Sequence, residues 1–301
     1  MVTDNLVRVA EQYGIAYKQC EAMALHTSFK LGGPADVLLK PSNLEQLKVI
    51  LSHTKREGIP CFVLGSGSNL LVSDKGIDGA VIAMSALNGI SIVGDGEIMA
   101  QAGVSLAALC CFARDNGLTG LEFAYGIPGS VGGAIYMNAG AYGGEMSHVV
   151  TEVTCLDGNL NELVRSGAEC EFGYRESVYR KNSEIIESAV FKLKHGDKSK
   201  IAAEMETIIN KRKLSQPLDF PSAGSTFKRP DGYFAAALID ECGLKGRSVG
   251  GAEVSTKHAG FVINKNRATC SDVLGLIDVI KATVKEKKNV DLETEVIFVG
   301  R

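Results

Sequence analysis

The feature that most constrains this chain is a glycine-rich stretch in its middle. The 22 residues between Glu122 and Glu145 carry no charge, and they include seven glycines and Pro128. A run of this length is long enough to cross a bilayer, but glycine and proline strongly disfavour a continuous helix. The sequence therefore predicts a system of tight loops here rather than a membrane helix.

The glycines of this stretch form two clusters, with Asn138 between them: Gly126-Ile127-Pro128-Gly129-Ser130-Val131-Gly132-Gly133 and Gly140-Ala141-Tyr142-Gly143. Glycine lets the backbone approach a ligand without a Cβ in the way, and Ser130 and Asn138 add polar groups. This density favours a cradle for a diphosphate and an isoalloxazine ring over a purely structural turn.

A smaller glycine loop, Gly65-Ser66-Gly67-Ser68-Asn69, follows the apolar run Cys61–Leu64. Its amide groups are suited to a phosphate, but a tight turn that needs positive φ explains such a loop equally well. The spacing G-x-G-x-x-G with a helix after it is missing, so a standard NAD-binding fold is not expected.

Composition narrows the class of protein. The chain has 45% hydrophobic and 22% charged residues, and 32 basic and 35 acidic residues are interspersed for a net charge of −3. We therefore expect a globular protein that binds neither nucleic acid nor an anionic membrane. The eight cysteines include no C-x-x-C pair, which predicts reduced thiols and no metal site. The charged N-terminus lacks a signal-peptide core, so we expect a cytoplasmic protein.

A length of 301 residues predicts two domains of mixed α and β structure. The polar segment 195–199 marks the expected boundary between them. Periodicity, capping residues and glycine stops predict the following elements. We expect helices over 43–57, 105–116, 200–213, 234–242 and 271–287, and strands over 61–64, 79–84, 90–93, 97–101, 149–156, 160–164, 185–193, 250–254, 260–264 and 291–299.

Three segments carry residues capable of chemistry. In the loop Pro221–Pro230, a hydroxyl near Lys228 and Arg229 could donate a proton to a carbanion, and the two cations could bind phosphates; a rigid connector is the alternative. Arg175, in a run of aromatic and polar residues, is by itself typical of a solvated surface. Glu295 lies in an alternating terminal strand, where burial would raise its pKa, although an exposed edge strand explains the pattern more simply.

Taken together, the sequence resembles the UDP-N-acetylenolpyruvoylglucosamine reductases, flavoenzymes also called UDP-N-acetylmuramate dehydrogenases. The resemblance covers nearly the whole chain, and its motifs follow one another in the same order. They are His26–Ala35, Leu64–Leu71, Gly126–Gly133, Gly173–Ser177, Ser222–Ser225, Gly243–Gly246, Val254–His258 and Glu293–Glu295.

This resemblance implies an α+β fold. An FAD-binding region of the vanillyl-alcohol-oxidase/p-cresol-methylhydroxylase type would span 1–195, in two lobes split near residue 80, and a substrate-binding domain would span 196–301. It also implies that NADPH reduces a non-covalently bound FAD and departs before the UDP-sugar enters. Hydride would then reach the methylene carbon of an enolpyruvyl ether.

The resemblance also implies roles for individual residues. Ser225 matches the proton donor to the neighbouring carbon, and Arg175 and Glu295 match the pair that stabilises the developing charge. The implied cofactor-binding residues are Gly65, Ser66, Gly67, Ser68, Asn69, Gly126, Ile127, Pro128, Gly129, Ser130, Gly132, Gly133 and Asn138. The implied substrate-binding residues are Lys228, Arg229, Arg212 and Tyr136, with Tyr142 as a second tyrosine candidate and no metal ligand.

At position 229 this chain has arginine, whereas some relatives carry asparagine. No insertion lies between Arg175 and the boundary near residue 195, so the chain resembles the shorter subclass of the family. The expected partners are small molecules, NADPH and a UDP-sugar, and the expected state is a monomer. Two alternatives remain: a flavin oxidase of the same fold, and a UDP-sugar sensor without catalysis. A sensor would have no reason to keep Ser225, Arg175 and Glu295 together.

Overall fold

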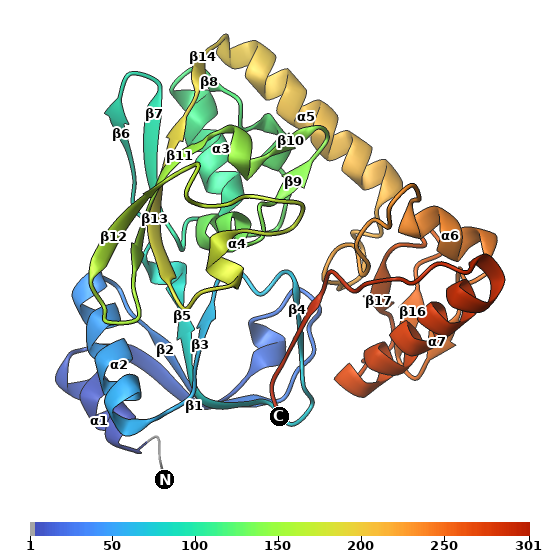
Figure 1. Cartoon of the computed structure of the whole chain (residues 1–301), viewed down its shortest axis with the longest axis horizontal. Coiled ribbons are helices and arrows are strands. Elements are labelled where there is room, and N and C mark those ends of the chain that lie inside the picture. The colour runs from blue at the N-terminus through green and yellow to red at the C-terminus, as the bar shows by residue number, and fades with distance from the viewer. Residues whose placement is uncertain (1–3) are drawn as a thin grey trace. The chain divides into compact units, whose positions relative to one another are not determined.

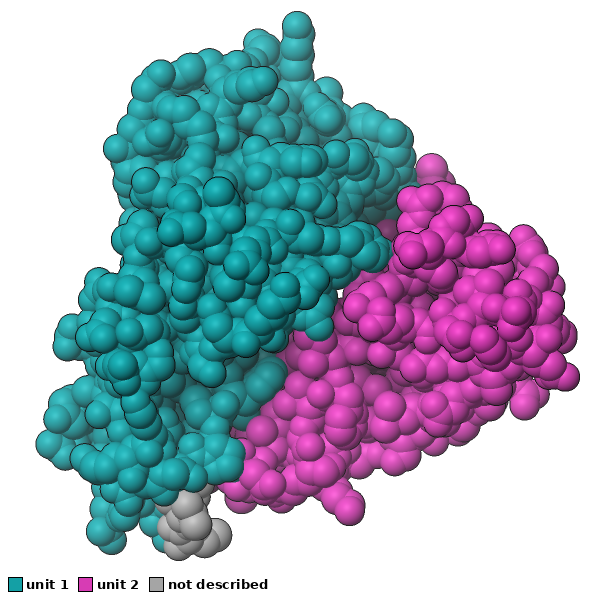
Figure 2. Space-filling view, viewed as in Figure 1, with its two compact units in different colours: residues 1–18, 37–66, 79–212 teal, residues 19–36, 67–78, 213–301 magenta. Residues whose placement is uncertain are grey.

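The computed structural model describes residues 4–301, and these form two compact units, coloured separately in Figure 2. Unit 1 contains residues up to Lys18, Val37–Ser66 and Gly79–Arg212. Unit 2 contains Gln19–Asp36, Gly67–Asp78 and Lys213–Arg301. These units differ from the predicted linear division at 195/196, because two N-terminal segments join unit 2 and unit 1 continues to Arg212.

The N-terminal part of the chain forms helix α1 (Asp4–Gln12), helix α2 (Leu44–Glu57) and a four-stranded sheet. The sheet has the order β1-β2-β5-β3, with β1 at Ala16–Ala22, β2 at Pro34–Lys40, β3 at Cys61–Leu64 and β5 at Ile77–Ala83. Helix α2 confirms its prediction: Asn43 caps it by accepting a bond from the Gln46 amide, and Gly58 ends it at a φ of 63°. The sequence pattern missed β1, since most of its side chains are exposed and do not alternate.

Unit 1 also contains a five-stranded antiparallel sheet (Figure 1), in the order β12-β11-β13-β7-β6. Its strands are β6 (Ile90–Gly94), β7 (Glu97–Gln101), β11 (Val150–Leu156), β12 (Glu162–Ser166) and β13 (Ile185–Lys192). The turn between β11 and β12 is closed by the Asp157 carboxylate, which accepts bonds from the amides of Asn159 and Asn161 at 2.7 and 2.8 Å. This confirms the predicted hairpin.

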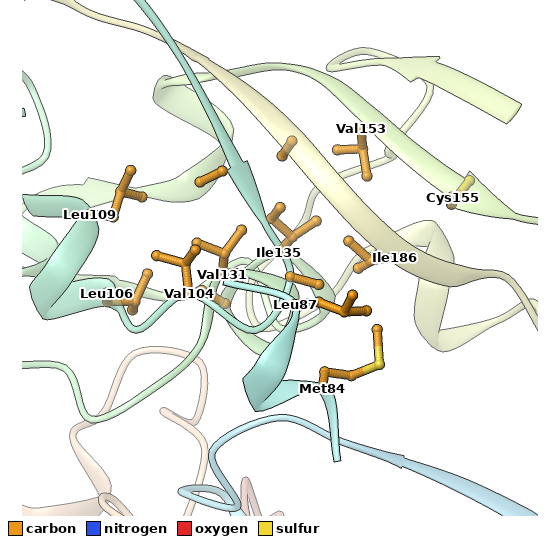
Figure 3. Packing of buried hydrophobic residues seen from close by; sticks show 14 of the residues in the cluster. Met84, Leu87, Val104, Leu106, Leu109, Val131, Ile135, Val153, Cys155 and Ile186 are labelled. Carbon is orange, nitrogen blue, oxygen red and sulfur yellow. The ribbon is translucent and has the colours of Figure 1, made fainter. Parts of the chain in front are cut away.

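Two helices belong to this part of unit 1, and the second of them packs on β13 and β7 of the sheet. They are α3 (Leu106–Asp115), capped by Ser105, and the short α4 (Val131–Tyr136), capped by Ser130. Figure 3 shows Val131 and Ile135 of α4 among buried residues such as Leu87, Val104 and Ile186. The stretch predicted as loops therefore contains one helical turn and a half, held by its apolar side chains.

Short elements complete unit 1. Strand β8 (Leu118–Thr119) pairs with β14 (Lys194–His195), and β9 (Gly140–Ala141) pairs with β10 (Gly144–Glu145). Helix α5 (Lys198–Ser215) begins in unit 1 and extends slightly beyond its predicted ends. The 3₁₀ turns of the chain are η1 (Met23–Leu25), η2 (Met84–Ala86), η3 (Glu122–Ala124), η4 (Met146–His148) and η5 (Val178–Arg180).

Unit 2 is built on helix α7 (Cys270–Lys288), which packs with α6 (Ala235–Glu241) and a sheet of order β15-β16-β17. These strands span Ser248–Val249, Ala252–Val254 and Val262–Asn264. The core of this unit also includes Phe29, Leu31 and Leu71 from the N-terminal part of the chain. Burial of these apolar side chains explains why segments far away in the sequence belong to the same unit.

The predicted strand over 291–299 is wrong in most of its length. Only β18 (Ile297–Val299) is a strand, and it pairs in parallel with β4 (Leu70–Val72). Before β18 the chain changes partner, since the Glu293 carbonyl accepts from Lys228 and the Glu295 amide donates to Thr226. The predicted alternation of faces therefore fails, and Phe298 is exposed while Val296 is buried.

Candidate active site

The two glycine loops meet in unit 1 through Gly65 and Ser130. A Cβ placed on Gly65 would lie 2.4 Å from the Ser130 hydroxyl oxygen, which is closer than van der Waals contact allows. Glycine at position 65 is therefore required by the approach of the two loops. This contact shows that two motifs recognised separately in the sequence share one place in the fold.

Several amide groups of these loops are free to bind an anion. Within residues 4–301, the amides of Ser66, Gly67 and Ser68 donate to no acceptor, and the same is true of Gly129 and Ser130. Backbone N–H groups of this kind form favourable sites for phosphate oxygens. Within unit 1, the amides of Ser66, Gly129 and Ser130 therefore fit a phosphate group of a dinucleotide such as FAD, and within unit 2 the amides of Gly67 and Ser68 do so by themselves.

Three further amides of the second loop are already used by the protein. Val131 donates to the Val104 carbonyl, Gly132 to the Ala102 carbonyl, and Gly133 to the Ser130 hydroxyl at 3.3 Å. A Cβ on Gly132 would lie 2.9 Å from the Ala102 Cβ, so internal packing requires this glycine. Gly133, by contrast, is exposed. A Cβ placed on Gly133 would have only the Ser130 hydroxyl within 4 Å, so the space beside Gly133 is open to a ligand.

Asn138, predicted to contact the cofactor, is bonded within unit 1. Its side chain is fully buried, donates to the Gly173 carbonyl at 2.9 Å and accepts from the Ser147 amide at 3.0 Å. Its φ of 41° lies in the left-handed region, which Asn tolerates better than most residues. Both ends of the amide are thus bonded within unit 1, so Asn138 positions the turn that carries Arg175.

Arg175 lies at the tip of that turn and its guanidinium contacts the second glycine cluster. Its Nη2 donates to the Gly140 carbonyl at 3.1 Å, and the guanidinium carbon lies 5.2 Å from the centre of the Tyr174 ring. The side chain is half-buried rather than fully solvated. The structure therefore holds this arginine in a defined place beside the glycine loops.

Glu145 lies near Arg175 and was not predicted from the sequence. Its pKa is lowered: burial works against this, while hydrogen bonds from Ser147 and Asn138 and the charges of His148 and Arg175 favour the carboxylate. An ionised Glu145 therefore contributes to the field around Arg175. No motif in the sequence marked this glutamate, since only the fold brings it to Arg175.

Arg212 is a half-buried cation of unit 1. No hydrogen bond or ion pair to it is found within residues 4–301, and its pKa is lowered by burial. Its Cδ would lie 3.1 Å from a Cβ on Gly126, whose φ is 93°, so the arginine packs on the glycine loop. An unpaired, half-buried guanidinium at this loop fits an anionic ligand group.

The two tyrosine candidates differ, since Tyr136 is half-buried and Tyr142 is 46% exposed.

Within unit 2, main-chain bonds bring Ser225 and Glu295 close together. Thr226, the residue after Ser225, donates from its amide to Gly260 and accepts from the Glu295 amide at its carbonyl. The Thr226 hydroxyl also accepts from the Val262 amide at 3.0 Å. Ser225 itself is exposed and Glu295 is half-buried, so both side chains lie at the surface of a rigid frame.

Asn69 supports the same frame. Its side-chain amide donates to the Glu295 carbonyl at 3.1 Å, and its own carbonyl accepts from the Ile297 amide. The last residue of the first glycine loop thus fixes the segment that carries Glu295. The predicted cofactor contact of Asn69 stays a prediction, and its side chain and carbonyl bond the chain itself.

The two cations after Phe227 are held by different groups. Lys228 forms an ion pair with Glu293 at 3.0 Å, and its amide donates to the Glu293 carbonyl. The guanidinium carbon of Arg229 lies 4.0 Å from the centre of the Phe234 ring, which is itself exposed. This stacking gives Arg229 a defined orientation at the surface of unit 2.

Neither unit shows a metal centre or a membrane segment. Among residues 4–301, no group of His, Cys, Asp and Glu side chains is arranged to hold a metal ion. Over the same residues, every helix is too short or too polar to cross a membrane.

Comparison with known proteins defines the class. A model of an FAD-binding domain matches residues 35–165, so the chain is a flavin-dependent oxidoreductase with a separate C-terminal domain. A second model, the C-terminal domain of UDP-N-acetylenolpyruvoylglucosamine reductase, matches residues 216–299. The chain belongs to the UDP-N-acetylenolpyruvoylglucosamine reductase family.

Similar proteins cover almost the whole chain. The UDP-N-acetylenolpyruvoylglucosamine reductase of Clostridium tetani is 50% identical over 94% of this chain and 92% of its own length. That of Caldanaerobacter subterraneus is 50% identical over 93% and 92%. The crystal structure of the Thermus caldophilus enzyme is 35% identical, has a TM-score of 0.81, and is matched over 95% of this chain and 98% of that one. These matches confirm the predicted family, the α+β fold and the enzyme class.

Proposed function

We propose that this chain catalyses the NADPH-dependent reduction of UDP-N-acetylglucosamine enolpyruvate to UDP-N-acetylmuramate, with FAD bound non-covalently. Membership of a reductase family that serves peptidoglycan precursor synthesis supports this reaction. The observation that supports it most in the structure is the main-chain bond between Thr226 and Glu295, which fixes the residue after Ser225 to the segment that carries Glu295. A protein that only bound the sugar would have no use for such a pair.

The glycine loops would hold the cofactor. The free amides of Ser66, Gly67, Ser68, Gly129 and Ser130 would bind its diphosphate, and the exposed Gly133 leaves room beside them. When bound, FAD supplies hydride transfer between the nicotinamide and the enolpyruvyl group. Gly65, Gly126 and Gly132 would shape these loops, together with Ile127 and Pro128.

In the reduction of the enolpyruvyl ether, a hydride equivalent ends on the methylene carbon and a proton ends on the carbon beside it. We propose that the Ser225 hydroxyl donates this proton. Negative charge develops on the substrate carboxylate only as the reaction proceeds, so Arg175 and Glu295 would stabilise the transition state more than the bound substrate. Lys228, Arg229 and Arg212 would bind the phosphates, and Tyr136 the uridine.

An anaerobic titration tests the proposal. We expect the purified protein to be yellow, to lose its absorbance near 450 nm on addition of NADPH, and to regain it on addition of the enolpyruvyl UDP-sugar. A protein that keeps its absorbance with NADPH would be a sensor, and one that is reoxidised by oxygen but not by the UDP-sugar would be an oxidase. Release of all colour on denaturation would support non-covalent FAD.

We further propose that the enzyme is a monomer and acts in the cytoplasm, where NADPH is available to it. Sedimentation at several protein concentrations tests the first statement, and cell fractionation tests the second.

A further inference from the structure

Arg175 occupies an unusual backbone conformation that other residues must hold. Gly173 and Glu176 each donate an amide to the carbonyl of the other, at 3.0 and 3.2 Å, which places Tyr174 and Arg175 at the tip of a tight turn. The φ of Arg175 is 55°, in the left-handed region that residues with a Cβ seldom adopt. Such a conformation persists only where surrounding bonds outweigh its cost.

Arg180 supplies one of these bonds. It ends the 3₁₀ turn η5, is half-buried, and donates from Nη1 to the Arg175 carbonyl at 2.6 Å. Within residues 4–301 this carbonyl is the only acceptor of the Arg180 guanidinium, and no carboxylate pairs with it.

The neighbouring cations of unit 1 differ from Arg180 in this respect. Arg165 forms a double hydrogen bond to Glu184, and Lys181 forms an ion pair with Glu176 at 3.3 Å. Burying part of a cation without an acidic partner is unfavourable, so placing Arg180 against the Arg175 carbonyl costs free energy.

Different residues hold the backbone carbonyl and the guanidinium of Arg175. Arg180 bonds the backbone carbonyl, while the Gly140 carbonyl accepts from the guanidinium at 3.1 Å. Asn138 holds the start of the same turn through the Gly173 carbonyl. Loss of Arg180 would therefore loosen the backbone under Arg175 without removing the guanidinium itself.

We propose that Arg180 is a positioning residue for Arg175, which it holds in the left-handed conformation that aims the guanidinium at the substrate carboxylate. The inference rests on the proposed function, since it needs Arg175 to stabilise charge in the second half-reaction. Stabilisation of developing charge depends strongly on placement, and an error of about 1 Å can cost about 100-fold in rate.

The test compares Arg180→Met and Arg180→Lys with the control Lys181→Met, which removes a charge from the next residue. Each variant is reduced with NADPH and then reoxidised with the enolpyruvyl UDP-sugar in a stopped-flow instrument. For Arg180→Met we expect NADPH to reduce the flavin at the wild-type rate. Reoxidation by the UDP-sugar should be slowed about 10- to 100-fold. Arg180→Lys, which keeps a donor, should recover part of the rate, and Lys181→Met should match wild type in both steps.

A double-mutant cycle separates positioning from a general structural effect. If Arg180 acts through Arg175, the substitution of Arg180 should change reoxidation less than about twofold in an Arg175→Ala background. Equal effects in both backgrounds would overturn the inference, as would wild-type reoxidation of Arg180→Met. Should Arg180→Met fail to fold, the same cycle is run with Arg180→Lys. Failure of the wild-type enzyme to be reoxidised by the UDP-sugar would instead overturn the proposed function.

Discussion

The amide of Glu295 donates a hydrogen bond to the carbonyl of Thr226 at 2.9 Å. Since Thr226 directly follows Ser225, this one bond joins two segments, far apart in the sequence, that each carry a candidate catalytic residue. The bond uses only main-chain atoms, so substitution of either side chain leaves it in place. Variants at Ser225 and Glu295 therefore report on chemistry rather than on the frame.

Ser225→Ala should be reduced by NADPH at the normal rate but reoxidised slowly by the enolpyruvyl UDP-sugar. The loss should be about 10²- to 10⁴-fold, the usual contribution of a general acid. Ser225→Cys, which keeps an ionisable proton, should recover part of it. Stopped-flow absorbance at 450 nm measures both steps.

The control for this experiment is Ser222→Ala. Ser222 lies in the same proline-bounded loop, where its carbonyl accepts from the Ser28 hydroxyl. This bond uses the main chain of Ser222 and survives the substitution. If Ser222→Ala and Ser225→Ala behave alike, the two serines only shape the loop and the proton comes from another group.

Glu295→Gln should retain more reoxidation rate than Glu295→Ala. The amide keeps a hydrogen-bond donor at the position where we propose that the glutamate contacts the substrate carboxylate, whereas alanine leaves that group unpaired. Reduction by NADPH should be almost unchanged in both variants. Mild and equal losses would show that Glu295 is an ordinary surface carboxylate.

Valine at two adjacent glycines should have different effects. Gly132→Val forces a Cβ to within 2.9 Å of the Ala102 Cβ, so it should destabilise the fold, by about 1–3 kcal/mol. Gly133→Val meets little protein and should preserve stability, but it places a larger side chain where we propose that FAD binds. Thermal melting and the ratio of absorbance at 450 and 280 nm measure the two effects. Full FAD content in Gly133→Val would count against this part of the cradle.

Asp272 should make the stability of unit 2 depend on pH. Its carboxylate accepts from the amides of Thr269 and Gly251, and these bonds lower its pKa below the usual value. A carboxyl whose pKa is lower in the folded state than in the unfolded state stabilises the fold at a pH above its unfolded pKa of about 3.9. This stabilisation is lost as the pH falls through the pKa of the folded state. Asp272→Asn loses the charge near the N-terminus of α7, which is capped by Thr269, so we expect it to unfold slightly more easily than wild type at neutral pH.

The comparison of urea unfolding at neutral and acidic pH checks this sign. The difference between wild type and Asp272→Asn should shrink as the pH falls below the usual range of aspartate. If the difference in unfolding free energy between wild type and Asp272→Asn stays constant into acidic pH, the hydrogen bonds of the side chain, and not its charge, stabilise the start of α7.

Much of the secondary structure could be predicted because it depends on nearby residues. The cap at Asn43, the stop at Gly58 and the turn at Asp157 each act within a few positions of the chain, so their signals are visible in the sequence. The family was equally visible, since its glycine motifs and its Gly173–Ser177 motif are continuous segments.

The failures have a common physical cause, which is that the deciding partners are distant in the sequence. The alternation in 291–299 indicated one long strand, but the segment bonds first to residues 226–228 and then to β4, so only its last three residues extend as a strand. The partners of Asn138 are equally distant in the sequence, since its side chain bonds the Gly173 carbonyl and the Ser147 amide, while its cofactor contact stays a prediction.

The sequence by itself determined the family, the glycine loops, most helices and strands, and the residue types available for chemistry. Only the tertiary structure decided which segments share a core, which glycines are needed for packing, and which residues hold Arg175 and Glu295. The physical reason is that periodicity and capping are local properties, whereas the burial of Phe29 and Leu71 with α7, or the bond from Arg180 to Arg175, depends on contacts that exist only once the chain has folded.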